Sequence, residues 1–294
     1  MSDATYAAPA AEQPAVHDRS IGAIIAETRN LSADQVARVL AYQQENNVRF
    51  GEAAIALGLA SADDVMFALA QQFHYPAALG KESAHAELVT LNQPYGPQAE
   101  FFRALRSQVI MRVFTEDKSS RQALAVVSAN RGDGKSFVAA NLAVCLAQLG
   151  GRTLLIDADM RSPRLHELFK VSNDVGLSGI LAGRANGRLI QTVAAVPGLF
   201  VLPVGATPPN PLELIERPAF GLLMRELIGK FDYVIVDTPA ADQGADALVV
   251  ANRCGAAVPL ARRDASTLDG VRHLVRSMQD AGVNVTGAVF NDHS

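Results

Sequence analysis

Along residues 97–294, short apolar segments alternate with longer segments whose apolar positions recur at helical spacing. The apolar segments predict strands at 123–128, 153–156, 199–203, 233–237, 256–261 and 283–290. The segments between them predict helices at 137–149, 162–169, 219–229 and 268–281. Near-continuous apolar strands separated by helices are typical of a mainly parallel sheet with helices on both faces. We therefore expect a doubly wound α/β domain.

One of the predicted strands, 256–261, contains Pro259. Proline has no N–H group to donate to a neighbouring strand, so it is largely confined to edge strands and bulges. We expect this strand to be bulged or to lie at the periphery of the sheet.

The region before this domain is helical in pattern and repeats itself. Residues 20–43 align with residues 49–72 at an offset of 29 positions, and the run Ser-Ala-Asp that begins at Ser32 recurs at Ser61. Each of these serines precedes a helical pattern, where its side chain can accept a hydrogen bond from a backbone N–H of the first turn. Each copy therefore predicts two short helices.

These patterns divide the chain into four parts. Residues 1–18 are rich in Ala and Pro and predict a flexible tail, and residues 19–78 predict a small, mainly helical domain. Residues 79–96, with two glycines and two prolines nearby, predict a linker before the α/β domain at 97–294.

Composition and charge narrow the function classes. The 294-residue chain is 49% hydrophobic and 19% charged, which excludes a mainly disordered or collagen-like protein. Its formal net charge of -4 gives no basic field for nucleic acid, so we expect no nucleic-acid partner. No apolar run long enough to span a membrane and no signal-peptide pattern occurs, and we expect a cytoplasmic protein. Cys145 and Cys254 lie in apolar segments and predict reduced packing residues.

A glycine-rich loop with a Lys-Ser pair follows the first predicted strand and opens a helix. It reads Arg131-Gly132-Asp133-Gly134-Lys135-Ser136-Phe137. Glycines let the backbone approach a phosphate, and the helix N-terminus supplies N–H groups and a positive dipole end. The lysine can reach the outer phosphates, and the serine hydroxyl can bind Mg²⁺. We predict that this loop binds ATP and Mg²⁺, although Ala129 stands where such loops usually begin with glycine.

Carboxylates end two further apolar strands. Asp157 and Asp159 follow the strand 153–156, and Asp237 ends the strand 233–237. A carboxylate beside bound phosphates can hold Mg²⁺ or accept the proton of a hydroxyl group.

Together these motifs resemble the bacterial tyrosine kinase family, and within it the EpsG-type chain-length-determinant kinases of exopolysaccharide synthesis. The likeness rests on the glycine-rich loop and on the runs from Ile156 to Arg161 and from Ile235 to Pro239. It implies ATP-dependent phosphorylation of protein tyrosine. The implied catalytic residues are Lys135, Asp157 and Asp159, and the implied metal ligands are Ser136, Asp157 and Asp237. How Asp157 and Asp159 divide the roles of base and metal ligand stays open.

The same resemblance implies two kinds of partner. One is a membrane protein of the chain-length-determinant class, which would activate the chain and anchor it at the inner membrane. The other is a further copy of this chain, bound through Glu100, Arg103 and Arg106, which share one face of a predicted helix. The alternative for that helix is an ordinary surface helix with local ion pairs.

A related class, the partitioning and division-site ATPases, is the alternative function: a nucleotide switch without tyrosine phosphorylation. Those proteins usually carry lysine at the position that Asn130 holds here, and the absence of that lysine favours the kinase. No tyrosine follows Tyr233. A scheme in which one copy phosphorylates tyrosines in the C-terminal tail of its neighbour therefore lacks its substrate here. Tyr6 and Tyr95 are the more accessible candidates for phosphorylation.

The helical repeat is similar to the N-terminal domain of type II secretion ATPases, some of which bind cyclic di-GMP. The second copy keeps Arg49 and Gly51, whereas the first has Ser20 in place of the arginine and Arg29 where glycine is expected. An arginine can stack on guanine or pair with phosphate. We therefore expect weak or no binding of cyclic di-GMP, the alternative being a protein-docking module.

Overall fold

The computed structural model describes residues 20–72, 84–114, 121–184, 187 and 189–292. The chain divides into two compact units, residues 1–77 and 78–294. The predicted tail at 1–18, with Tyr6, lies outside the described residues.

The described residues of the first unit, 20–72, form four helices, as the repeat predicts. They are α1 (Ile21–Thr28), α2 (Ala33–Asn46), α3 (Phe50–Ala56) and α4 (Ala62–Gln72). Ser32 caps α2 in a capping box with Gln35, and the Ser61 hydroxyl accepts from the backbone N–H of Asp64 at 3.2 Å. The two copies interlock, because α1 packs on α4 and α2 packs on α3.

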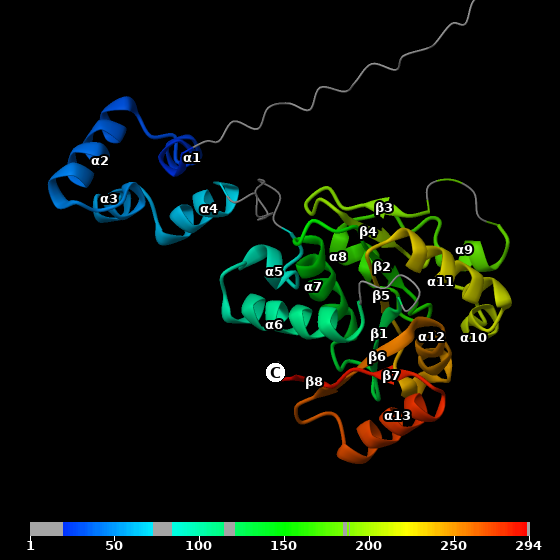
Figure 1. Cartoon of the computed structure of the whole chain (residues 1–294). Helices are drawn as coiled ribbons and strands as arrows, with labels where there is room; N and C mark the ends of the chain where they lie inside the picture. The colour runs from blue at the N-terminus through cyan, green and yellow to red at the C-terminus, as the bar shows by residue number, and fades with distance from the viewer. Residues whose placement is uncertain (1–19, 73–83, 115–120, 185–186, 188, 293–294) are drawn as a thin grey trace, which may run out of the picture. The chain divides into compact units, whose positions relative to one another are not determined.

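The second unit is built on an eight-stranded sheet whose strands run in the order β3-β4-β2-β5-β1-β6-β7, with β8 also paired to β6 (Figure 1). The strands are β1 (Ala123–Ser128), β2 (Thr153–Asp157), β3 (Gln191–Thr192), β4 (Leu199–Leu202), β5 (Tyr233–Asp237), β6 (Gly255–Arg262), β7 (Asn284–Val285) and β8 (Val289–Asn291). The pairs are parallel except β3 with β4.

Helices cover both faces of this sheet (Figure 1). They are α5 (Val89–Asn92), α6 (Pro97–Arg112), α7 (Lys135–Ala147), α8 (Leu165–Phe169), α9 (Leu177–Leu181), α10 (Pro211–Ile215), α11 (Pro218–Lys230), the 3₁₀ turn η2 (Ala241–Gln243), α12 (Asp246–Cys254) and α13 (Leu268–Asp280).

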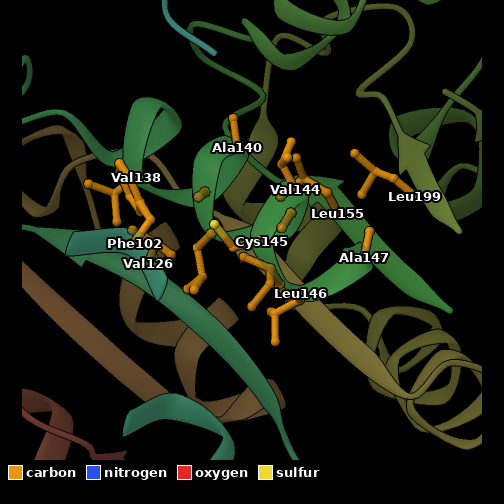
Figure 2. Close-up of a cluster of buried hydrophobic side chains, with 14 of the residues drawn as sticks. Phe102, Val126, Val138, Ala140, Val144, Cys145, Leu146, Ala147, Leu155 and Leu199 are labelled. Carbon is orange, nitrogen blue, oxygen red and sulfur yellow. The ribbon is translucent and has the colours of Figure 1, made fainter. Parts of the chain in front are cut away.

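Alternate residues of β1 show how the two hydrophobic layers form. Leu124 and Val126 pack toward α6 and α7, in the layer that Figure 2 shows around Phe102, Val144 and Leu155. Their neighbours in β1 pack on the opposite face, toward α11, α12 and α13. Every residue of β1 is buried, which is why the strand is apolar throughout rather than alternating. The doubly wound fold predicted from the sequence is confirmed.

Pro259 does not mark an edge or a bulge, so that expectation is wrong. Strand β6 runs without interruption and pairs with β1 on one side, where Pro259 lies opposite Val127. On its other side it pairs with β7 through residues 256–257 and with β8 through residues 260–262. The proline therefore falls where one partner strand has ended and the next has not begun, and its missing N–H breaks no ladder there.

Part of the predicted linker is folded into the second unit. Residues 84–96 are described and include α5, and the buried Leu88 and Leu91 belong to the same hydrophobic layer as α7. The side chain of Asn141 in α7 makes four hydrogen bonds, three of which hold this segment. It accepts from the N–H and hydroxyl of Thr90 at 3.1 and 3.0 Å, and donates to the carbonyls of Glu87 and Phe137 at 2.8 and 2.9 Å.

Both cysteines are buried packing residues. Burial raises the pKa of the Cys145 thiol to about 11. Among the helices of the described residues, none combines the length and the apolar character needed to cross a bilayer.

Candidate active site

The glycine-rich loop connects β1 to α7, and its two glycines have backbone conformations that other residues rarely adopt. Gly132 has φ 86° and Gly134 has φ 102°. A Cβ atom on Gly134 would also lie 2.5 Å from Nδ2 of Asn291. These turns bring the loop N–H groups to the N-terminus of α7, which begins at Lys135.

Contacts from distant parts of the chain brace this loop. The carboxylate of Asp133 is fully buried and accepts from the N–H of Asn130 at 3.0 Å and from the Ser266 hydroxyl at 3.0 Å. The backbone carbonyl of Asp133 accepts from Asn291 Nδ2 at 3.0 Å, and Arg262 donates to the Gly132 carbonyl at 3.1 Å. The side chain of Asp133 therefore stabilises the loop from within.

A pocket of about 670 Å³ opens in front of the loop. The residues named from the sequence that line it are Arg131, Gly132, Gly134, Lys135, Ser136, Phe137 and Asp159. Asp133, Asp157 and Asp237 do not line it; the two strand-end carboxylates are fully buried.

The sequence analysis missed the opposite walls of the pocket. These residues are Ala86, Glu87, Val89, Gln98, Ser162, Arg164, Arg262 and Asn291. The first four precede β1, in or next to the segment that was expected to be a linker. The Arg164 guanidinium pairs with the Glu87 carboxylate at 2.5 Å, which joins two of these walls.

Lys135 is buried beneath the pocket, only 7% exposed. Its ammonium group donates to the Ser128 hydroxyl at 3.0 Å, and that hydroxyl donates in turn to the Asn130 carbonyl at 2.8 Å. A buried ammonium group held by a neutral hydroxyl is well suited to receive an anion, because pairing offsets the cost of burying its charge.

The three predicted carboxylates lie close together but have different surroundings. Asp157 and Asp237 are register partners at the ends of the neighbouring strands β2 and β5. The oxygens of Asp157 accept backbone N–H groups of Asp159, Arg164 and Leu165 at 3.1–3.2 Å. Neither oxygen of Asp237 has a hydrogen-bond partner among the described residues.

Burial raises the pKa of Asp237 to about 7, although the nearby Ser136 hydroxyl and Lys135 charge oppose the rise. Burial raises the pKa of Asp157 well above its usual range too, with the Asp237 charge adding to the effect. The charges of two carboxylates buried this close together repel each other, and a divalent cation with oxygen ligands would relieve that repulsion. The residues present therefore fit Mg²⁺.

Asp159 is held differently from Asp157. Its Oδ1 atom accepts from the N–H groups of Arg161 and Ser162 at 3.1 and 2.9 Å, which leaves Oδ2 outside these turns. Asp159 is also the member of the three that lines the pocket. The arrangement can bind a phosphorylated ligand and place one carboxylate next to it.

The three charges expected at a contact between copies lie on α6. Arg103 donates to the Glu100 carboxylate at 2.8 Å and to the Pro94 carbonyl, and Arg106 donates to the Cys145 carbonyl at 3.0 Å. Both arginines thus bind their own chain, whereas the Glu100 side chain is 73% exposed.

Comparison with known proteins gives the family of the site. A family profile described as "CobQ/CobB/MinD/ParA nucleotide binding domain" matches residues 124–294. The chain is 36% identical over 204 residues to EpsB of Ralstonia solanacearum, in an alignment that covers 69% of this chain but only 27% of EpsB. It is 32% identical over 193 residues to the tyrosine-protein kinase CpsD of Streptococcus agalactiae, covering 65% of this chain and 81% of CpsD. The kinase domain of the Escherichia coli tyrosine kinase ETK superposes with a TM-score of 0.66 at 33% identity, covering 72% of this chain and 82% of that domain.

Proposed function

The chain belongs to the CobQ/CobB/MinD/ParA nucleotide-binding family and, within it, to the bacterial tyrosine-protein kinases, and we propose that it transfers the γ-phosphoryl group of ATP to a protein tyrosine in capsule or exopolysaccharide export. The observation that carries this proposal is the convergence of the braced loop, Lys135 and Asp159 on one pocket. In the reaction, the tyrosine oxygen forms a bond to the γ-phosphorus, the bond from that phosphorus to the β-phosphate oxygen breaks, and ADP leaves.

The loop residues 131–137 hold the phosphates. Their N–H groups and the N-terminus of α7 offer donors that need no rearrangement, and Lys135 stabilises the charge that develops on the phosphates during transfer. The Lys135 ammonium group already lies next to the loop, bonded to Ser128. Binding the phosphates then exchanges a neutral partner for a charged one.

Ser136 and Asp237 would hold Mg²⁺, which would offset the negative charge of the phosphates. The support is the pair of unpartnered Asp237 oxygens beside Ser136. Asp157 contributes charge to the same place, but three backbone N–H groups occupy its oxygens. We assign it chiefly to shaping the loop that follows β2.

Asp159 accepts the proton of the tyrosine hydroxyl. Its carboxylate lines the pocket, and only Oδ1 is engaged by the turn at Arg161 and Ser162. A carboxylate placed this way can take up a proton as the new bond to phosphorus forms.

The nucleotide base occupies a second groove that adjoins the phosphate pocket. This groove, of about 330 Å³, shares Gln98, Phe137 and Asn291 with the first pocket. It also includes the exposed rings of Phe101 and Phe290, and aromatic rings are good partners for a planar base.

We also propose two partners. The first is a membrane protein of the chain-length-determinant class, which would activate the enzyme and hold it at the inner membrane. The second is another copy of this chain, contacted through α6. Because Arg103 and Arg106 already have partners in their own chain, Glu100→Lys is the sharper test, and light scattering should show a loss of oligomer relative to the wild type.

The decisive experiment incubates the purified chain with Mg²⁺ and ATP, with and without a candidate membrane partner, and probes for phosphotyrosine. We expect phosphotyrosine in the wild type and none in Asp159→Asn. Among the described tyrosines, Tyr95 is 42% exposed while Tyr233 lies in β5 against Phe114, so Tyr95→Phe tests the more accessible acceptor on this chain. Release of inorganic phosphate alone, with no phosphotyrosine on chain or partner, would replace the kinase by a nucleotide switch.

A further inference from the structure

Arg161 belongs to the motif that follows β2, yet it does not line the pocket and has no role in the proposed reaction. Its guanidinium Nη2 atom donates to both oxygens of Asp246, at 3.0 and 3.3 Å. Asp246 is the first residue of α12, 85 positions further along the chain, and its side chain is 1% exposed. The pair therefore ties the loop after β2 to a helix from a different part of the fold.

The surroundings of this pair make room for it. Gly244, in the turn before α12, has φ 148°, and a Cβ atom there would lie 2.8 Å from Asp246 Oδ2 and 3.3 Å from Arg161 Nη2. A side chain at this position would displace the carboxylate or the guanidinium. The carboxylate also lies in the first turn of α12, where the helix dipole favours a negative charge.

The pair connects directly to the pocket through the backbone of Arg161. The N–H of Arg161 donates to Asp159 Oδ1 at 3.1 Å, so holding the Arg161 side chain also fixes a donor of the Asp159 carboxylate. Helix α12, which begins at Asp246, also packs against β1, the strand that leads into the phosphate loop. The elements that position the phosphate loop therefore also hold Asp159.

We propose that Asp246 is a positioning residue, which acts through Arg161 to fix the Asp159 carboxylate relative to the phosphate loop. This inference rests on the proposed role of Asp159. It makes Asp246 important for the rate of the chemical step and unimportant for nucleotide binding, since neither Asp246 nor Arg161 lines the pocket.

A purely structural role predicts a different result. Breaking a buried ion pair from one side leaves an uncompensated charge and destabilises the fold, whereas replacing both partners by apolar residues of similar size is often neutral or stabilising. The paired variant Arg161→Met with Asp246→Leu therefore separates the two roles. It removes the tether to Asp159 without leaving a charge buried.

The experiment compares the full-length wild type with Asp246→Asn, with the paired variant, and with Glu226→Gln as control. The control removes one partner of the exposed Lys230–Glu226 ion pair on α11, whose two side chains are 61% and 59% exposed. Thermal midpoint, ATP affinity and kcat for tyrosine phosphorylation are measured for each protein. If the wild type forms no phosphotyrosine, the kinase proposal fails on that protein alone. The kcat values of the variants are then compared for ATP hydrolysis instead.

We expect kcat to fall by about 10- to 100-fold in both Asp246 variants, because small misplacements of a reacting group have effects of this size. ATP affinity should stay at the wild-type value, and the paired variant should recover the thermal midpoint but not kcat. The control should match the wild type in all three measurements. Recovery of kcat together with stability in the paired variant, or a loss confined to ATP affinity, would overturn the proposal.

Discussion

Replacing Asp237 by asparagine should stabilise the protein without ligand increasingly as the pH rises from about 4 to about 7. Asp237 is fully buried, and neither of its oxygens has a hydrogen-bond partner among the described residues. Burial raises its pKa from the ordinary 3.8 to about 7. Below the pKa of the unfolded state, Asp237 is protonated in both the folded and the unfolded protein, and its titration does not affect stability. Between the two pKa values, the folded protein keeps this proton and the unfolded protein has lost it.

The sign follows from that difference in bound protons. Where the folded state binds more protons than the unfolded state, the free energy of unfolding falls as the pH rises. A rise of about three units corresponds to about 4 kcal/mol lost by pH 7, at about 1.4 kcal/mol per unit. Asparagine carries no charge, so the variant escapes this loss. Its own unpaired amide has a cost that does not change with pH.

The measurement is the difference in thermal midpoint between Asp237→Asn and wild type at several pH values between 4.5 and 8, without nucleotide or divalent cation. For a protein of this size, 4 kcal/mol corresponds to an upper limit of about 8–16 °C. Asp280→Asn, which changes an exposed carboxylate at the end of α13, is the matched control. A midpoint difference for Asp237→Asn that stays level across this range would refute the argument that the buried carboxylate is held without a partner.

Three further substitutions test other parts of the two units. Lys135→Met should abolish ATP turnover while leaving the thermal midpoint within a few degrees, because the lost bond to Ser128 is a single one and the stem keeps its length; turnover in a folded variant would remove the lysine from the reaction. Asn141→Leu removes three hydrogen bonds to the segment before α6, two of them at the buried Thr90, and should cost about 2–5 kcal/mol in denaturant unfolding, with weaker ATP binding because Glu87 lies in the pocket wall. Calorimetry of the full chain should show no binding of cyclic di-GMP at about 1 µM, because the first copy lacks an arginine contact worth about 10- to 100-fold and its Arg29 pairs with Asp64 at 3.2 Å. Binding that is tight and lost in Arg49→Ala would show that one copy suffices.

The strands of the second unit were predictable because each is buried on both faces. Strand β1 is buried at all six positions and β2 at all five, so their sequences are apolar without alternation. The helices on the sheet were less completely predicted: α12 was missed, although its buried residues Ala247, Val250, Ala251 and Cys254 recur at helical spacing. Pro259 was misjudged because the rule for prolines in strands considers one neighbouring strand, whereas two short strands share that side of β6.

The same limits apply to the site. The sequence placed Lys135, Ser136 and Asp159 at the pocket because the order strand, glycine loop and helix is local. It did not separate Asp157 from Asp159, since what distinguishes them is how many of their oxygens accept backbone N–H groups and which of them lines the pocket. Nor did it show that the Asp133 side chain turns inward, because its partner Ser266 is 133 residues away.

The wall formed by residues 86–98 shows how far the pocket depends on chain outside the family motif. The family profile begins at residue 124, yet Ala86, Glu87, Val89 and Gln98 line the pocket in front of the loop. This wall does not rest on the sheet edge but on Asn141, in the second turn of α7, and on the ion pair from Glu87 to Arg164 in the loop after β2. Both attachments belong to segments whose other residues line the pocket, namely the start of α7 and the loop after β2. A ligand in the pocket is therefore in contact with the stretch of chain that leads from the helical repeat into the nucleotide-binding unit.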